Sequence, residues 1–243
     1  MSSPQTGLQE VTKPQRRPAP EPRSEESMTR QVYAQLREAI MTGRFLPGQL
    51  LSLRGVAAVV GSSTMPVRTA LNMLHAEGAL INGTGRALMV PPMTMELLEE
   101  IRDVRIALEG CVVERAAKQM TDAALAEIAQ LMQEMDLHIA NDDVAAYLRA
   151  NFAFHTSIYR CGASDATLAS IQSFWLRIGP FVNLMVQDMK HMKHSMAAHR
   201  KILRALKARD GVAARAGIED DIRESASHLS LQLLQADRRR PAK

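Results

Sequence analysis

The sequence predicts a mostly α-helical protein that combines a small basic N-terminal module with a larger helical bundle. The composition, with 46% apolar and 23% charged side chains among 243 residues, is ordinary for a globular protein. From about residue 94 to residue 236, apolar side chains recur at helical spacing almost without a break. The charge is uneven, since residues 29–92 carry six arginines against two glutamates, whereas residues 93–236 carry 16 basic and 19 acidic residues. A basic module is the kind of surface that a polyanion partner requires.

The two ends of the chain differ in composition from the parts between them. Residues 1–28 hold five of the eleven prolines and few apolar side chains, which predicts a disordered N-terminal extension. Residues 237–243 form a basic tail, with four cationic side chains against Asp237. The first residues lack the apolar segment of a secretion signal, and no apolar run approaches the roughly 20 residues that span a bilayer. Two cysteines are too few for a disulfide scaffold, which favours reduced thiols in the cytoplasm. The sequence therefore predicts a cytoplasmic protein that has no membrane partner.

The module at residues 29–92 contains five predicted elements, and their order indicates the fold. Spacing and helix breakers predict a helix from about residue 28 to Gly43, a turn at 46–48, a short helix over 53–60, a second helix with Ser63 as its N-cap, and a hairpin with strands at 79–81 and 87–90. This order predicts a winged helix-turn-helix. In that fold the second helix of the pair enters the major groove with its N-terminal residues near the base edges.

Residues 93–236 are predicted to form an antiparallel all-α helical bundle. The breaks in the periodic pattern separate six helices, at 94–118, 122–140, 143–161, 165–189, 191–209 and 211–236. Helices of this length joined by short connections pack as antiparallel neighbours. The fold class is therefore mostly α, with an N-terminal winged helix-turn-helix and a C-terminal bundle.

Several residues of the N-terminal module have the chemistry of DNA contacts. Ser63 as N-cap places the amides of the helix N-terminus close to a phosphate group. Arg68 lies one turn into the same helix and can reach the O6 and N7 atoms of guanine. Glycines at the hairpin tip allow close approach to the minor groove. Charged helix faces are usually only solvated, so Arg54 and Arg86 are alternatively surface residues without a partner.

The motifs of this module, taken in order, resemble the DNA-binding domain of GntR-family bacterial regulators. They are Gly43-x3-Pro47-Gly48-x2-Leu51, the run from Val60 to Leu71, and Leu74-x2-Glu77-Gly78. The resemblance implies contacts from the helix before the turn, the first turn of the recognition helix and the wing tip, namely Arg54, Ser63, Thr64, Arg68, Thr84 and Gly85. The sequence departs from the usual pattern at Thr64, Met65 and Thr69, where Arg, Thr and Glu are usual. These departures leave room for an operator that differs from the family's commonest one.

Four polar residues of the bundle can converge on one site. Asn151 and His155 are four residues apart and share one face of a helix. His199 and Asp221 lie on the last two helices, and they meet in the core if these helices are antiparallel neighbours. Neutral imidazole together with carboxylate suits a divalent metal, and helical bundles build such sites from facing helices. The alternative is that the two buried histidines satisfy each other or backbone groups.

The same positions resemble the C-terminal ligand-binding domain of FadR-type regulators, in the six-helix variety of the VanR group. The matching motifs are Val104-Arg105-x2-Leu108-Glu109, Asn151-x2-Phe154-His155-x2-Ile158 and the stretch from His199 to Asp210. Many such domains bind a divalent metal through an Asp and three His. The resemblance therefore implies a site for zinc, nickel or manganese at His155 and His199, with Asn151 in place of the Asp and Asp221 in place of the third His.

Two arginines of the bundle are candidate anchors for a small carboxylate effector. Arg105 can face the metal site and bind a carboxylate as a fork, or it can pair with Glu109 at i,i+4. Arg177, beside Trp175, is a second candidate.

These observations predict a transcriptional regulator, most simply a repressor, that binds double-stranded operator DNA as a homodimer. A two-fold dimer doubles the small contact set of one module over two half-sites. The effector would act through the stiff linker at residues 90–95, which contains Pro91 and Pro92. The protein is predicted not to be an enzyme, because it has no nucleophile–base pair, phosphate loop or cofactor fingerprint. The alternatives are a metal-dependent enzyme that acts on a small acid and a DNA-binding protein that responds to no effector.

Overall fold

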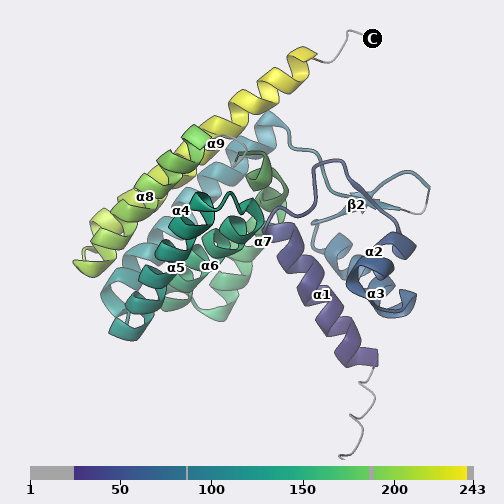
Figure 1. Ribbon diagram of the computed structural model, residues 1–243, viewed down its shortest axis with the longest axis horizontal. Coiled ribbons are helices and arrows are strands. Elements are labelled where there is room, and N and C mark those ends of the chain that lie inside the picture. The colour runs from purple at the N-terminus through teal and green to yellow at the C-terminus, as the bar shows by residue number, and fades with distance from the viewer. Residues whose placement is uncertain (1–24, 86, 186–188, 240–243) are drawn as a thin grey trace, which may run out of the picture.

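The computed structural model describes residues 25–85, 87–185 and 189–239, which form a small mixed module beside a bundle of long helices (Figure 1). The first helix, α1 (Glu25–Met41), begins three residues before the predicted start. The prediction of disorder for residues 1–28 is therefore wrong for 25–28, and residues 1–24 lie outside the described residues. Glu25 and Glu26 favour the earlier start, because negative charge is stabilising at a helix N-terminus.

The N-terminal module has the winged helix-turn-helix order. After α1 come β1 (Leu50–Leu51), α2 (Leu53–Val60), α3 (Thr64–Ala76), β2 (Ile81–Asn82) and β3 (Leu88–Met89). The strands form an antiparallel sheet in the order β1-β3-β2, in which Met89 pairs with both Leu50 and Ile81. The hairpin was predicted but β1 was not, because β1 pairs with a strand far along the chain instead of with a neighbour across a short turn. Gly61 ends α2 in the left-handed conformation at φ 64°, which favours glycine.

The core of this module forms where α1 crosses α3. Val32, Leu36 and Ile40 of α1 are buried together with Val67, Leu71 and Leu74 of α3. The opposite face of α3 is exposed from Thr64 onwards, apart from Pro66 and the core positions. The first helix therefore acts as a scaffold that holds the recognition helix at the surface.

In the part of the chain that the structure describes, the bundle consists of six helices, as predicted. They are α4 (Met95–Gln119), α5 (Asp122–Ala140), α6 (Val144–Gly162), α7 (Asp165–Met185), α8 (Met189–Lys207) and α9 (Gly211–Arg239). Thr94, Thr121 and Asp143 each accept a hydrogen bond from a backbone amide of the helix that follows, which explains why the breaks were visible in the sequence. Residues 237–239 continue α9 rather than belonging to a separate tail, and residues 240–243 lie outside the described residues.

Helix α9 packs between α4 and α8 and projects beyond the rest of the bundle at its C-terminal end (Figure 1). Helices α5 and α6 are neighbours on the other side of α4. The connection from α8 to α9 is three residues long, and Asp210 caps α9 by accepting a hydrogen bond from the amide of Ala213. The short connection makes α8 and α9 antiparallel neighbours.

Helix α7 lies between the bundle and the N-terminal module, and Gly179 makes its contact with α1 possible. A Cβ atom on Gly179 would lie 2.4 Å from the carbonyl oxygen of Ile40 and 2.7 Å from the Cα of Met41. We expect Gly179→Ala to destabilise the protein by roughly 1–3 kcal/mol, because the obstacle is backbone and cannot rotate away. Thermal unfolding followed by circular dichroism measures the change.

Gly110→Ala in α4 is the matched control for this prediction. Its added Cβ would meet only the flexible side chains of Glu219 and Arg215, at 3.1 and 3.4 Å. Equal stability of the two variants would contradict the role given to Gly179.

Candidate functional site

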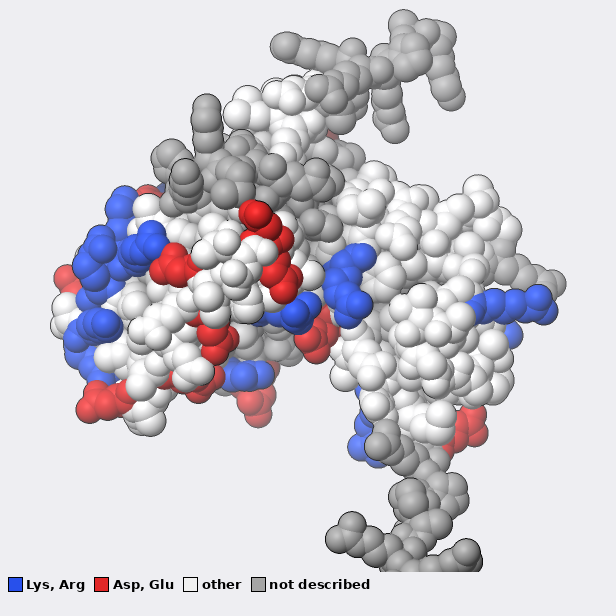
Figure 2. Space-filling view, in the orientation of Figure 1, with Lys and Arg blue, Asp and Glu red and all other residues white. Residues whose placement is uncertain are grey.

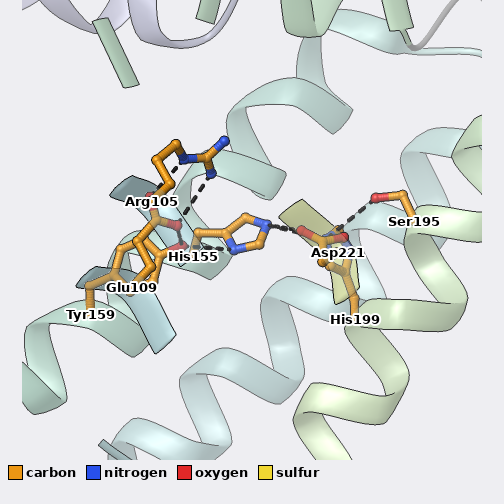
Figure 3. A network of polar contacts seen from close by, with 7 residues as sticks. All are labelled: Arg105, Glu109, His155, Tyr159, Ser195, His199 and Asp221. Carbon is orange, nitrogen blue, oxygen red and sulfur yellow. Dashed lines mark hydrogen bonds and ion pairs between the residues drawn. The ribbon is translucent and has the colours of Figure 1, made fainter. Parts of the chain in front are cut away.

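A cluster of polar side chains is buried in the bundle where α6, α8 and α9 meet (Figure 3). The Nε2 atoms of His155 and His199 lie 3.2 Å apart. The carboxylate of Asp221 lies 3.7 Å from the first ring and 3.6 Å from the second. All three residues are at least nine-tenths buried, and one ligand atom from each lies within 4.8 Å of the others. The structure thus brings together three of the four predicted metal ligands.

A chain of hydrogen bonds extends from His155 to the first helix of the bundle. The Tyr159 hydroxyl lies 3.4 Å from Nδ1 of His155 and donates to Oε2 of Glu109 at 2.5 Å. Glu109 in turn accepts from Nε and Nη2 of Arg105, at 2.7 and 3.2 Å. Since the Tyr159 hydroxyl donates to Glu109, it can accept from an Nδ1–H of His155. That tautomer leaves the Nε2 lone pair of His155 pointing at His199 and Asp221.

The electrostatics of the cluster favour binding of a cation. Burial raises the pKa of Asp221 to about 7, although the nearby Arg105 guanidinium favours its ionised form. Burial, with the proximity of His199 and Arg105, holds the pKa of His155 well below its ordinary value. The His155 ring is therefore neutral at neutral pH, and among the described residues no lysine or arginine forms an ion pair with Asp221. Two imidazoles and a carboxylate in this state are the donors of a divalent metal site.

The cluster faces a cavity of about 50 Å³. Asn151, one turn before His155 on α6, is buried and lines this cavity, as does Arg105. Apolar walls come from Leu98, Ile101, Trp175, Ile178 and Val182. The space holds a few water-sized groups, so a larger ligand requires the walls to move.

Four further polar residues of the cavity were missed in the sequence, and two of them, Ser195 and Tyr147, lie near the predicted ligands; the others are Arg102 and Ser225. Ser195 lines the cavity with its hydroxyl oxygen 3.5 Å from Nε2 of His199. Tyr147 also lines it, and burial raises the pKa of this phenol to about 12. Each lies four residues before a predicted ligand, Ser195 before His199 and Tyr147 before Asn151. The i,i+4 rule that paired Asn151 with His155 would have found both.

The two predicted effector anchors are in different places. Arg105 is buried, pairs with Glu109 as one of the two alternatives proposed, and lies with its Cζ 5.2 Å from the centre of the Trp175 ring. Arg177 is not in this cavity, so its assignment to the same effector site is wrong. It is exposed and lines a separate cavity of about 180 Å³ with Gly78 and the Pro91-Pro92 linker. Arg177 is two residues after Trp175, which corresponds to a rotation of about 200° around the helix axis. The two side chains therefore point to opposite faces of α7.

The residues predicted to contact DNA are exposed at three places of the N-terminal module, on α2, at the start of α3 and at the wing tip. Arg54, Thr64 and Arg68 are exposed, and neither arginine forms an ion pair within the part of the chain that the structure describes. Ser63 occupies the N-cap position of α3, but its hydroxyl makes no capping bond and is available to a phosphate group. Thr84 and Gly85 are exposed at the wing tip, where Gly85 has φ 65°.

The surface of the two parts differs in charge. In the view of Figure 2, the N-terminal module shows a few separated basic side chains and one small acidic patch on a largely uncharged surface, whereas acidic and basic side chains are interspersed over the bundle. Among the described residues, no helix combines the length and the apolar character needed to cross a membrane.

A winged helix-turn-helix with an exposed recognition helix, joined to a helical domain, defines the class of DNA-binding transcriptional regulators. The chain belongs to the GntR family: residues 28–90 match the description "Bacterial regulatory proteins, gntR family", and residues 100–224, about half of the chain, match the FCD domain. The family predicted from the motifs is thereby confirmed.

The similar proteins are also regulators. The chain is 28% identical to the HTH-type transcriptional regulator McbR of Escherichia coli over 186 residues, which cover 76% of this chain and 84% of the relative. It is 29% identical to the gluconate operon transcriptional repressor of Bacillus subtilis over 155 residues, 64% of this chain and 62% of that protein. The solved structure of E. coli McbR/YncC superimposes with a TM-score of 0.79 at 26% identity, covering 85% of this chain and 99% of that one. These relatives are transcriptional regulators and not enzymes, in agreement with the prediction.

Proposed function

We propose that this regulator is a homodimeric repressor whose affinity for operator DNA is set by a small carboxylate ligand at a divalent metal in the bundle. The observation that carries the proposal is the convergence of His155, His199 and Asp221 on one cavity. The repressor role is supported by similarity to proteins described as gluconate operon repressors. A DNA-bound regulator of this family would act in the cytoplasm, where the bacterial chromosome lies.

The donor set fits zinc, nickel or manganese. Two imidazole nitrogens and one carboxylate oxygen are ligands that these ions accept, and Asn151 adds an amide oxygen at the same cavity. The orientation of His155 by Tyr159 and Glu109 is the kind of outer support that metal-binding histidines usually have. When bound, the ion would offer an attachment point for a carboxylate, and Arg105 on the cavity wall adds a positive charge.

The homodimer is proposed from the geometry of reading DNA. One recognition helix and one wing reach only a few base pairs, whereas two modules related by a two-fold axis reach two half-sites about one helical turn apart. A ligand in the bundle can then alter DNA affinity only by binding better to one arrangement of the two modules than to the other.

The double variant His155→Ala, His199→Ala tests the metal site. We expect it to lose all divalent-metal binding while it keeps the DNA affinity that the wild type has without metal, because the N-terminal module is separate from the cluster. Elemental analysis of protein purified without chelator and titration calorimetry with zinc, nickel and manganese measure the metal. His75→Ala in α3 is the control, because it removes an imidazole whose Nδ1 lies against the carbonyl oxygen of Leu80, far from the cluster.

Absence of metal from the wild-type protein, together with unchanged thermal stability on adding each ion, would reject the site. The cavity would then be a metal-free polar pocket. If the wild type instead binds metal but its DNA affinity ignores both metal and small acids, the regulator responds to no effector at this site.

A further inference from the structure

Helix α7 contacts both the buried cavity and the N-terminal module. Trp175, Ile178 and Val182 form part of the cavity wall. The Trp175 ring lies with its centre 5.4 Å from that of His155, in a tilted arrangement. A ligand that changes the packing around His155 therefore also changes the packing of Trp175 on α7.

Helix α7 is also bonded to the recognition helix through one arginine. Arg37 of α1 donates from Nη1 to Oε1 of Gln172 on α7, at 2.9 Å. The same guanidinium donates from Nε to Oε2 of Glu77, at 3.4 Å. Glu77 is the C-cap residue of the recognition helix α3, and it also accepts a hydrogen bond from Tyr33 of α1. Gln172 lies three residues before Trp175, which is less than one turn from the cavity wall.

Two other contacts of α7 lie next to this bridge. The Arg177 guanidinium approaches Gly78, the residue after Glu77, and lies 3.5 Å from where a Cβ on that glycine would be. Gly179 receives the backbone of Ile40 and Met41 at the end of α1. All three contacts fall within about two turns of α7, and two of them are at the C-terminal end of the recognition helix.

We infer that Arg37 and Gln172 are positioning residues that fix the orientation of the recognition helix relative to the bundle, so that movement of the cavity wall on α7 changes DNA affinity. The inference rests on the proposed function for what the signal is. The bridge is observed in the structure and does not depend on that function. A planar guanidinium that uses different nitrogens for Gln172 and Glu77 holds both partners at one separation. A displacement of α7 must either carry α3 with it or break the 2.9 Å bond.

This route differs from the linker at residues 90–95 that the sequence suggested. The linker joins the two parts covalently, but the Arg37 bridge joins the end of the recognition helix to the cavity wall through side chains alone. The side chains of the bridge are only partly buried, with 17% of Arg37 and 31% of Glu77 exposed. They can therefore break their mutual bond and bind water when α7 moves.

The first experiment measures the orientation of the two parts without any ligand. Spin labels are placed at Val59 and Val212, which are 80% and 73% exposed on α2 and α9, in a background with Cys111 and Cys161 changed to serine. The labelled chain is diluted with unlabelled protein so that distances within one chain are read by pulsed electron spin resonance. We expect a narrow distribution for the wild type and a broadened one for Arg37→Ala and for Gln172→Ala.

Arg30→Ala is the matched control, because Arg30 is an exposed arginine of the same helix whose ion pair with Glu26 stays within α1. Its distribution should be that of the wild type. Distributions for Arg37→Ala and Gln172→Ala that are as narrow as the wild type's would overturn the inference.

The second experiment tests whether the bridge transmits a signal from the cluster to the DNA-binding module. A contact that only stabilises the fold would transmit none. A DNA duplex is selected from a random library by the wild-type protein, and its Kd is measured with and without zinc. We expect zinc to change the Kd of the wild type by about 5–150-fold, the usual range of coupling between two sites. Gln172→Ala should bind zinc with unchanged stoichiometry, yet its Kd should change by less than about twofold.

The outcomes separate the two hypotheses. A full zinc response in Gln172→Ala, or zinc binding by the wild type with no change in Kd, would refute the transmission of the signal through this bridge. If the wild type binds no zinc, the proposed metal site fails instead, and the spin-label distances then decide the positioning role alone.

Discussion

Asp221→Asn is expected to abolish divalent-metal binding and, at the same time, to stabilise the metal-free protein at pH 8. The carboxylate is the charged donor of the cluster, so the amide leaves the two histidines without an anionic partner to hold an ion. In the metal-free protein the same carboxylate is buried, and among the described residues it forms no ion pair with a lysine or arginine. Its replacement by a neutral side chain of the same size should therefore raise the free energy of unfolding by roughly 1–3 kcal/mol.

The gain in stability should depend on pH in a defined direction. The pKa of Asp221 is about 7 in the folded protein, against an ordinary value of 3.8 for the unfolded chain. Between these values the folded state holds a proton that the unfolded state has lost, so this residue's contribution to stability falls as the pH rises from about 4 to about 7. The variant has no such proton. Its advantage over the wild type should be close to zero near pH 4 and complete above about pH 8.

Urea unfolding at several pH values in the presence of chelator measures this difference. The pKa shift of His155 arises from burial, His199 and Arg105, so it is common to both proteins and cancels from the comparison. Asp220→Asn is the control, because Asp220 is exposed and pairs with Arg223 on the surface of α9. A variant that is less stable than the wild type at pH 8, or that still binds metal with full affinity, would contradict the assignment of Asp221.

Arg68→Ala is expected to weaken binding to a duplex selected by the wild type by roughly 5- to 150-fold, while the fold stays intact. This range corresponds to the roughly 1–3 kcal/mol of discrimination that a bidentate arginine contact with guanine provides. Arg68 is exposed on α3 and has no ion pair within the described segments, so its removal breaks no contact inside the protein. Arg54→Ala should weaken binding in the same way but less, because its contact is expected outside the recognition helix.

Fluorescence anisotropy with the selected duplex and with a scrambled one measures both parts of this expectation. Arg30→Ala removes the same charge from an exposed site on α1 and controls for the general attraction of DNA to cations. Loss of affinity for both duplexes to the same extent would show that Arg68 contacts only phosphate. An unchanged Kd for the selected duplex would remove Arg68 from the DNA interface.

Local patterns were sufficient for the order of the elements and for part of each site. Helix boundaries were marked by residues that act within one turn, such as the caps Thr94 and Thr121 and the left-handed Gly61. The shared face of Asn151 and His155 followed from the helical period alone. The motifs of the recognition helix and of the bundle were specific enough to identify the GntR family, which the family matches confirmed.

Contacts between residues distant in the chain were decided only by the tertiary structure. Spacing allowed Arg105 either to pair with Glu109 or to face the cavity, and the packing of α4 against α6 lets it do both, since Tyr159 completes the environment of Glu109. Arg177 stood beside Trp175 in the sequence, but the helical turn placed it against the other domain.

By itself, the sequence determined the helices, the winged module and the residue types available to DNA and to a metal, because propensity, capping and periodicity act over a few neighbouring residues. The closing of β1 onto β3, the meeting of His155 with Asp221 and the bridge from Gln172 through Arg37 to Glu77 were decided by the tertiary structure. Each joins elements separated by tens of residues, and their approach depends on how whole helices pack rather than on any local signal.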